Sequence, residues 1–268
     1  MLIAVPGSSD LGGVLGVSTA NPEALLRAIR DRFGPFRHRH VLVLSPRQLA
    51  SVAREQAHVV IASDPAVRVC VLPLRHHGLT LSLIGRAVLA AELRPDGWSD
   101  PGQAVQLVHS IAARSRSLIW HPSLGSVEEP HPSLGERIVG LVPARSYFHE
   151  LGSQGLVPAR SGPGGPTPYG WHVAGPPSAQ LQTSLNGVHL ESVDLSLAGR
   201  RPYAGRRSVE ITQLAPPYAR PLAGPACGSC TATLVGSLCA FCGCGPAGVR
   251  QPGEASPESV EAERGVRI

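Results

Sequence analysis

Four cysteines near the C-terminus form two Cys-x-x-Cys pairs, and this spacing constrains the chain more than any other feature. The pairs are Cys227/Cys230 and Cys239/Cys242, with eight residues between them. Two such turns present four soft thiolates, which are enough to close a tetrahedral zinc shell without water. A segment this small has almost no core of its own, so metal binding would supply its folding energy. The spacing therefore predicts one structural zinc ion on these four thiolates.

Residues 225–245 resemble the zinc-ribbon modules found at the ends of many bacterial proteins. The two cysteine pairs carry the resemblance, together with Gly243, which suits the tight knuckle in which backbone N–H groups approach the sulfurs. The resemblance implies a structural metal and nothing catalytic. Cys244 is a fifth thiol outside the pattern that could exchange with Cys242. A redox Cys-x-x-Cys pair and unliganded thiols are the alternatives to zinc.

A second hypothesis uses two of the same cysteines differently. His189 and Glu191 form a His-x-Glu sequence upstream of Cys227 and Cys230. Zinc-dependent nucleobase deaminases bind the metal with one His and two Cys, while the Glu shuttles protons for the attacking water. The loop 164–169 also resembles one in the bacterial double-stranded-DNA cytosine deaminase toxins. This resemblance over residues 164–230 implies a catalytic Glu191 and leaves the second cysteine pair unexplained.

The basic residues exclude several chemistries. All 24 are Arg, because the chain contains no Lys. A phosphate-binding GxxxxGK[ST] loop and a Schiff-base enzyme both need a Lys, so neither is present. The net charge of +5 allows weak contact with nucleic acid, but no Arg cluster with interleaved aromatic residues predicts a dedicated site.

No signal peptide or membrane span is predicted. The longest apolar stretch, 79–93, is interrupted by Arg86 and is too short to cross a bilayer. Five of the six cysteines lie within 18 residues, and Cys70 lies alone in an apolar run. This distribution indicates a metal site and a buried thiol in a reducing compartment, so we expect a cytoplasmic protein.

The first 120 residues alternate between strand and helix patterns. Short apolar runs predict strands at 2–5, 40–44, 58–62 and 67–74. Helices are expected from Asn21-Pro22 to about residue 33, over 46–56, over 79–93, and over 103–114 after the capped start Asp100-Pro101. This alternation predicts an α/β fold with an open, largely parallel sheet. Near-continuous apolar strands in such a sheet are covered on both faces, so six side chains should be buried: Val41, Val43, Val59, Ile61, Val69 and Val71.

The rest of the chain is expected to be less regular. The predicted domains are an α/β domain over 1–115, a loop-rich mixed region over 116–214, a Pro-rich linker over 215–226, a zinc ribbon over 227–245 and a disordered tail over 246–268. Strands are expected at 188–197 and 208–214. The short repeats HPSLG and GLVPAR, at 121/131 and 140/155, are too short to define a solenoid.

No motif in the first 220 residues names a reaction. Residues 1–220 contain no HExxH, GxSxG or GxGxxG. The histidines at 38, 40, 76 and 77 could join a site but are more simply surface or capping residues. We therefore predict a non-catalytic adaptor or regulatory protein, whose ribbon contacts a protein or nucleic acid partner and no membrane. The alternative is a zinc-dependent cytosine deaminase that uses His189, Glu191, Cys227 and Cys230.

Overall fold

A computed structural model describes residues 2–6, 13–33, 40–92, 100–127, 146–150, 155–159, 170–185, 188–193, 208–216 and 224–246. Its N-terminal half is built on a four-stranded parallel sheet in the order β2-β1-β3-β4. The strands are β1 (Leu2–Pro6), β2 (Leu15–Val17), β3 (His40–Pro46) and β4 (Arg68–Leu74). The helices are α1 (Ala24–Phe33), α2 (Ala50–Ser63), α3 (Gly78–Glu92) and α4 (Pro101–Arg114), with a 3-10 turn at Arg47–Leu49.

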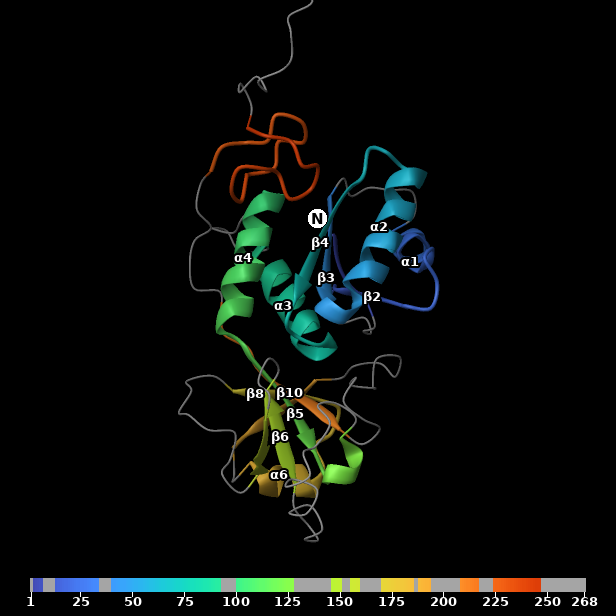
Figure 1. The fold of residues 1–268 in the computed structure, drawn as a ribbon. Helices are drawn as coiled ribbons and strands as arrows, with labels where there is room; N and C mark the ends of the chain where they lie inside the picture. The colour runs from blue at the N-terminus through green and yellow to red at the C-terminus, as the bar shows by residue number, and fades with distance from the viewer. Residues whose placement is uncertain are drawn as a thin grey trace, which may run out of the picture.

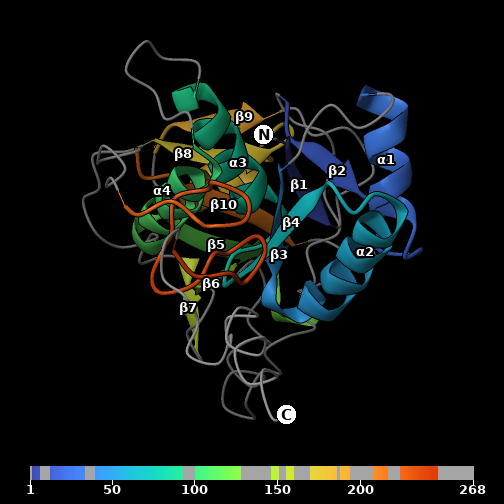
Figure 2. The same ribbon diagram turned by 90° about the horizontal axis from the view of Figure 1, so that it is seen from above.

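Helices cover both faces of this sheet (Figure 2). One core lies between the sheet and helices α1 and α2, and it includes Leu25, Val41 and Val60. The other lies between the sheet and helices α3 and α4, and it includes Leu42, Ile84 and Val108. The structure thus confirms the predicted α/β fold class with a parallel sheet.

The strand predicted at 58–62 is wrong, because these residues form the last part of α2. Val60 is fully buried against the sheet, whereas Ile61 is 37% exposed, as expected for one side of a helix. Packing on a sheet therefore overrides the strand preference of the β-branched run. Of the other five side chains expected to be buried, Val41, Val43 and Val69 are buried, and Val59 and Val71 are half-buried.

The second half of the chain forms a six-stranded mixed sheet in the order β7-β6-β5-β10-β8-β9. Its elements are β5 (Arg116–His121), β6 (Tyr147–Glu150), β7 (Leu156–Pro158), β8 (Trp171–Ala174), α6 (Ala179–Ser184), β9 (Leu190–Val193) and β10 (Val209–Gln213), with a 3-10 turn at Leu124–Ser126. One face packs on α6 through an apolar core that includes Trp120, Phe148 and Leu181. The loop 162–168, the second HPSLG repeat and the tail after 246 lie outside the described residues.

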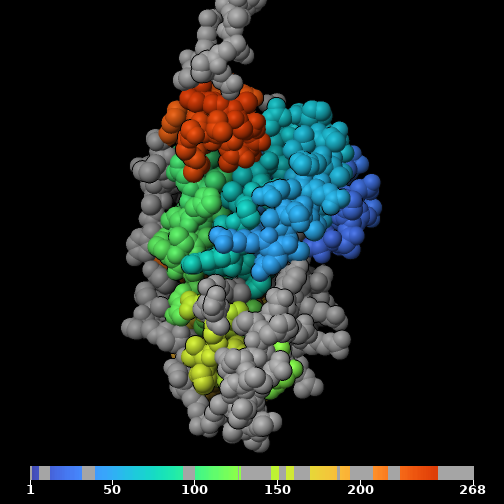
Figure 3. Space-filling view, viewed as in Figure 1, coloured from blue at the N-terminus to red at the C-terminus, as the bar shows by residue number. Residues whose placement is uncertain are grey.

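The cysteine segment, residues 224–246, lies on the opposite side of the α/β domain from this second sheet (Figure 1). In the space-filling view it is seated directly on the domain, beside α4 (Figure 3). Its Cys227, Leu234 and Phe241 belong to the same apolar core as α3 and α4. The cysteine segment therefore shares a core with the α/β domain, although the sequence predicts a Pro-rich linker before it. None of the helices in the described ranges has the length and apolarity needed to cross a membrane.

Candidate functional site

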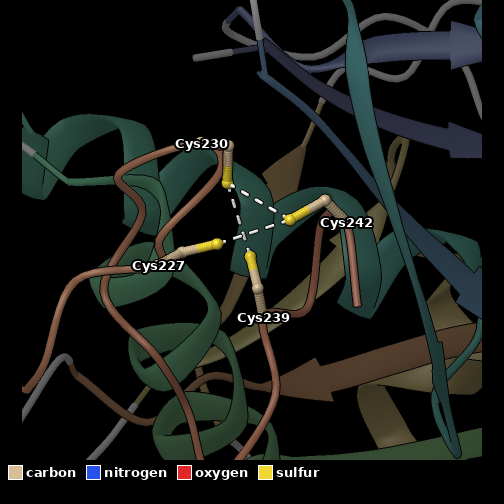
Figure 4. A group of neighbouring side chains, drawn as sticks. All are labelled: Cys227, Cys230, Cys239 and Cys242. Atoms are coloured by element: carbon tan, nitrogen blue, oxygen red, sulfur yellow. Dashed lines mark hydrogen bonds between the residues drawn. The ribbon is translucent and has the colours of Figure 1, made fainter. Parts of the chain in front are cut away.

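The four paired cysteines converge from two loops (Figure 4). Their Sγ atoms all lie within 4.8 Å of one another. Three of the separations are 3.4 Å for Cys227–Cys242, 3.5 Å for Cys230–Cys239 and 3.7 Å for Cys230–Cys242. A zinc tetrahedron with Zn–S bonds of about 2.3 Å has edges of about 3.8 Å, so the sulfur positions fit such an ion. The cluster can hold a metal ion, consistent with a zinc-ribbon-like segment.

The two loops repeat one backbone pattern. The N–H groups of Ser229 and Phe241 each donate to the sulfur two residues earlier, at 3.4 Å in both cases. Four residues after the first cysteine of each pair, Thr231 and Gly243 donate to the carbonyl of that cysteine and adopt positive φ angles of 62° and 72°. Each loop is therefore a knuckle whose backbone N–H groups point at its own sulfur.

The pKa values of the cysteine thiols differ between the sulfur cluster and the neighbouring Cys70. Burial raises the pKa of Cys70 to about 12, and the nearby Cys239 acts in the same direction. Burial also acts to raise the pKa of Cys242, but hydrogen bonds from the Cys244 backbone and from neighbouring thiols outweigh it and lower that pKa to about 6. Cys70 is thus an unreactive core residue. Within the cluster Cys242 favours the thiolate form, whereas burial raises the pKa values of Cys230 and Cys239.

A carboxylate and a glycine fix the cysteine segment to α4. Asp100 caps the helix by accepting from the N–H groups of Gly102 at 2.7 Å and Gln103 at 3.2 Å. The same carboxylate accepts from the Thr233 N–H at 2.8 and 3.0 Å. A Cβ atom on Gly102 would lie 1.8 Å from the Thr233 carbonyl oxygen. On the other flank, Phe241 meets the His40 ring edge-on with the ring centroids 5.1 Å apart.

A second cluster lies at the opposite end of the domain, where the carboxyl ends of the parallel strands face the second sheet. Side chains directly opposed across neighbouring strands share a face, so the strand register identifies which residues point toward α3. We call this set the inner face, and its members are Ser117, Ile119, His121, Tyr147, His149, His172, Glu210 and Thr212. Seven of these eight are buried, His172 being half-buried. The inner face is thus a largely polar surface enclosed between two sheets.

Glu210 joins the inner face to the start of α3. Its carboxylate accepts from the backbone N–H groups of Leu79 at 3.0 Å and Thr80 at 3.1 Å. It also accepts from the hydroxyls of Thr80 at 2.7 Å and Ser117 at 3.1 Å. The Thr80 hydroxyl contacts the Thr212 hydroxyl at 2.7 Å as well. A carboxylate at a helix N-terminus compensates the exposed N–H groups and the helix dipole there.

Two histidines, His76 and His77, interact electrostatically with this carboxylate, and two more, His121 and His149, belong to the inner face. Burial lowers the pKa of His76, whose Nε2 contacts the Ala112 carbonyl at 2.8 Å. Burial lowers the pKa of His77 too, with Glu210 opposing that effect and His149 adding to it. Burial, with a smaller contribution from His149, lowers the pKa of His121 to about 4. The buried imidazoles with lowered pKa values are therefore neutral at pH 7.

On the inner face, His121 and Tyr147 each present a buried atom that has no hydrogen-bond partner within the described part of the chain. These atoms are Nε2 of His121 and the hydroxyl of Tyr147. The two residues are directly opposed on β5 and β6. His121 Nδ1 contacts the Ser208 hydroxyl at 2.7 Å, so only its outer nitrogen is unpaired. Buried polar atoms are rarely left without partners, and such atoms indicate a place where a ligand or water binds.

The residues of the deaminase hypothesis are not brought together. His189 and Glu191 are exposed at the edge strand β9, and Glu191 contacts His172 at 3.3 Å. Neither belongs to the sulfur cluster, which is formed by the two cysteine pairs. Of the other histidines singled out from the sequence, His76 and His77 lie beside Glu210, His40 contacts Phe241, and His38 lies outside the described residues. Sequence reasoning did not single out Thr80, Ser117, His121, Tyr147, His149 or Glu210.

Comparison with solved structures identifies a DegV-like fold. A DegV family protein from Eubacterium eligens, loaded with heptadecanoic acid, matches with a TM-score of 0.55 and 10% identity over 80% of this chain and 99% of its own. A DegV family protein from Corynebacterium glutamicum gives 0.52 and 15% over 82% and 97%. The fatty acid kinase B3 protein from Streptococcus pneumoniae, loaded with linoleic acid, gives 0.52 and 10% over 80% and 99%. No protein-family model and no curated protein matches the sequence.

These comparisons contradict both predicted functions. The adaptor hypothesis assigned the function of the protein to the cysteine segment. The structural likeness instead covers about four-fifths of the whole chain. The structures it resembles include DegV family proteins and a fatty acid kinase B3 protein, two of them loaded with fatty acids, and these are neither deaminases nor zinc adaptors. Local cysteine spacing therefore indicated a metal-binding segment but gave the wrong function for the chain as a whole.

Proposed function

We propose that this protein binds a long-chain lipid between the carboxyl ends of its parallel strands and the inner face. The observation that carries the proposal is the DegV-like fold, whose solved examples from E. eligens and S. pneumoniae are loaded with fatty acids. Open α/β sheets generally bind their ligands outside the carboxyl ends of the strands. In this chain that end holds the enclosed polar face with its two unpaired atoms.

The chemistry of the interface suits an amphipathic molecule. Beside the polar inner face, Leu79 and Leu83 of α3 pack with Val193 of β9 in a small apolar cluster. The start of α3 therefore offers hydrogen-bonding groups and apolar side chains within the same interface. An acyl chain would lie against the apolar residues while the head group meets the histidines and Tyr147.

Lipid binding is tested on the purified full chain. Organic extraction followed by mass spectrometry should recover a long-chain lipid in a fixed ratio to protein. After removal of lipid, adding a long-chain ligand at 100 times its Kd should stabilise the protein by about 2.7 kcal/mol through mass action. Hexanoate, which has the head group of a fatty acid but little chain, is the matched control and should shift the melting temperature far less. No bound lipid and no shift with any long-chain ligand would show the proposal to be wrong.

We also propose that the sulfur cluster holds one zinc ion. Four thiolates at tetrahedral spacing suit zinc and leave no open position for a substrate, so the ion would be structural. Elemental analysis should find one zinc per chain, lost in Cys239→Ser and retained in Cys244→Ser. Retention of a full equivalent in Cys239→Ser would contradict the four-sulfur site.

A protein partner is proposed on the same structural likeness. The S. pneumoniae protein is named as a component of a fatty acid kinase. By analogy, the lipid bound by this chain would be presented to an enzyme that modifies its head group. Addition of such a kinase and ATP to the lipid-loaded protein should yield phosphorylated lipid. A rate of lipid phosphorylation no higher than the rate without this protein would contradict the proposal.

A further inference from the structure

The N-terminus of α3 is an anion-binding position that the protein fills itself. Helix N-termini attract anions because their first N–H groups are unpaired and the helix dipole is positive there. At α3 these donors, from Leu79 and Thr80, point at the Glu210 carboxylate. With the hydroxyls of Thr80 and Ser117, four hydrogen bonds converge on it, and the residue is only 8% exposed. An acceptor-only carboxylate satisfies all four donors.

The unpaired atoms lie in the next row of side chains along the sheet. Glu210 is directly opposed to Ile119 on β5, and His121 and Tyr147 form the adjacent opposed pair. His121 is a diagonal neighbour of Glu210 on the adjacent strand, and such side chains are about 7–8 Å apart, which is within electrostatic reach in a buried interface. A carboxylate bound at His121 and Tyr147 would therefore be repelled by the fixed charge of Glu210.

Cationic side chains that could offset this repulsion are scarce here. The chain has no Lys. Arg116 points to the other face of the sheet, where it pairs with Glu150 at 3.1 Å. Arg75 is exposed, although it acts electrostatically on His76. Within the described residues, the groups around Glu210 are otherwise imidazoles and hydroxyls, and burial lowers the pKa values of His76 and His77.

We propose that the inner face selects a lipid whose head group is un-ionised and carries a hydroxyl, such as a fatty alcohol or a monoacylglycerol. A hydroxyl both donates and accepts, so it can pair with the unpaired nitrogen of His121 and with the Tyr147 hydroxyl together. The Glu210 carboxylate occupies the anion-binding position at the N-terminus of α3, and its charge disfavours a ligand carboxylate beside it. The inference rests on the proposed lipid binding and specifies the class of lipid.

The test compares head groups on one acyl chain. The delipidated full chain is titrated in alkaline buffer with oleate, oleyl alcohol and monooleoylglycerol. We expect monooleoylglycerol and oleyl alcohol to bind at least roughly tenfold more tightly than oleate, because juxtaposed like charges are costly. Glu210→Gln should improve the affinity for oleate by about tenfold and leave the neutral lipids little changed. The matched control is Glu150→Gln, which removes the same charge from the opposite face of the sheet and should leave the preference intact.

A second variant keeps the test valid if Glu210→Gln fails to fold. Tyr147→Phe removes a hydroxyl that has no partner among the described residues, so the melting temperature should not fall. The affinity for monooleoylglycerol should nevertheless drop by roughly fivefold to tenfold, the size of one hydrogen bond. Wild-type protein that prefers oleate, with no response to either variant, would overturn the selection while leaving lipid binding in place. Wild-type protein that binds none of the three lipids would overturn the proposed function itself.

Discussion

The two ends of the α/β domain differ in how they are closed. At the amino ends of the strands, the cysteine segment is bonded to Asp100, the cap of α4, and fills the adjacent core with side chains from within residues 227–244. At the carboxyl ends, the inner face gathers residues from β5, β6, β8 and β10, which are far apart in the sequence. One end is thus a local motif, and the other exists only in the folded chain.

The hydrogen bonding at the two ends also differs. In the cysteine segment, backbone N–H groups meet the sulfurs, and Asp100 pairs with the Thr233 N–H. At the inner face, Glu210 is fully paired but His121 and Tyr147 each keep a buried unpaired atom. A closed sulfur shell serves stability, whereas unpaired buried atoms cost stability unless something binds them. The difference indicates a structural end and a ligand-binding end.

Loss of the metal should give the largest effect and test whether the cysteine end is structural. Since Leu234 and Phe241 belong to the core of α3 and α4, Cys239→Ser should lower the free energy of unfolding of the α/β domain by about 3–6 kcal/mol, the contribution of two large apolar side chains. Circular dichroism melts with and without a chelator measure it.

Cys244→Ser is the matched control, because Cys244 lies outside the four-sulfur cluster. It should melt like the wild type and respond to chelator in the same way. Equal melting of Cys239→Ser and Cys244→Ser would show that the segment contributes no stability to the domain.

Acid should act on the opposite end. Burial, followed by His149, lowers the pKa of His121 to about 4, so the folded protein resists a proton that the unfolded chain accepts near pH 6.5. The contribution of neutral His121 to the free energy of unfolding is fully present above about pH 6.5. It is lost as the pH falls toward 4, by up to about 3 kcal/mol. His121→Asn should flatten this part of the pH–stability profile measured by urea unfolding. His58→Asn, at an exposed position on α2, should leave the profile unchanged.

A single methyl group tests how closely the cysteine segment is docked. Gly102→Ala would place Cβ 1.8 Å from the Thr233 carbonyl oxygen, so α4 and the segment must separate. We expect a loss of about 1–3 kcal/mol, typical of overpacking, together with faster loss of metal to a chelator. Gly155→Ala meets no atom within 4 Å and serves as the control. Identical metal release from both variants would contradict close docking.

The sequence allowed the amino end to be predicted better than the carboxyl end. Cysteine spacing is a local signal, and the capped start at Asp100 is another, so the cluster and the beginning of α4 were expected where they occur. The second bond of Asp100, to Thr233, has no sequence signature because the partners are separated by 133 residues. The sequence analysis therefore identified the segment but missed its attachment to the domain.

The inner face could not have been recognised from sequence periodicity. Strand β10 alternates apolar and polar residues, as in Val209-Glu210-Ile211-Thr212. This pattern normally indicates a sheet with one face in water. Here the polar face is covered by the start of α3, so Glu210 and His121 are buried. Only the strand register and the approach of α3 place these residues together, and neither is encoded locally.

The smallest effect tests whether the two cysteine knuckles have equivalent backbone conformations. Thr231 is a β-branched residue at φ 62°, where left-handed backbone costs about 1–2 kcal/mol, while Gly243 occupies the matching position at φ 72°. Thr231→Gly should therefore raise the free energy of unfolding of the metal-loaded protein by about 0.5 kcal/mol, since the flexibility of glycine offsets part of the relief. Gly243→Ala should lower it by about 1 kcal/mol, although its new Cβ meets no atom within 4 Å. Denaturant unfolding of both variants measures the pair, and shifts in the same direction would show that the knuckles are not equivalent.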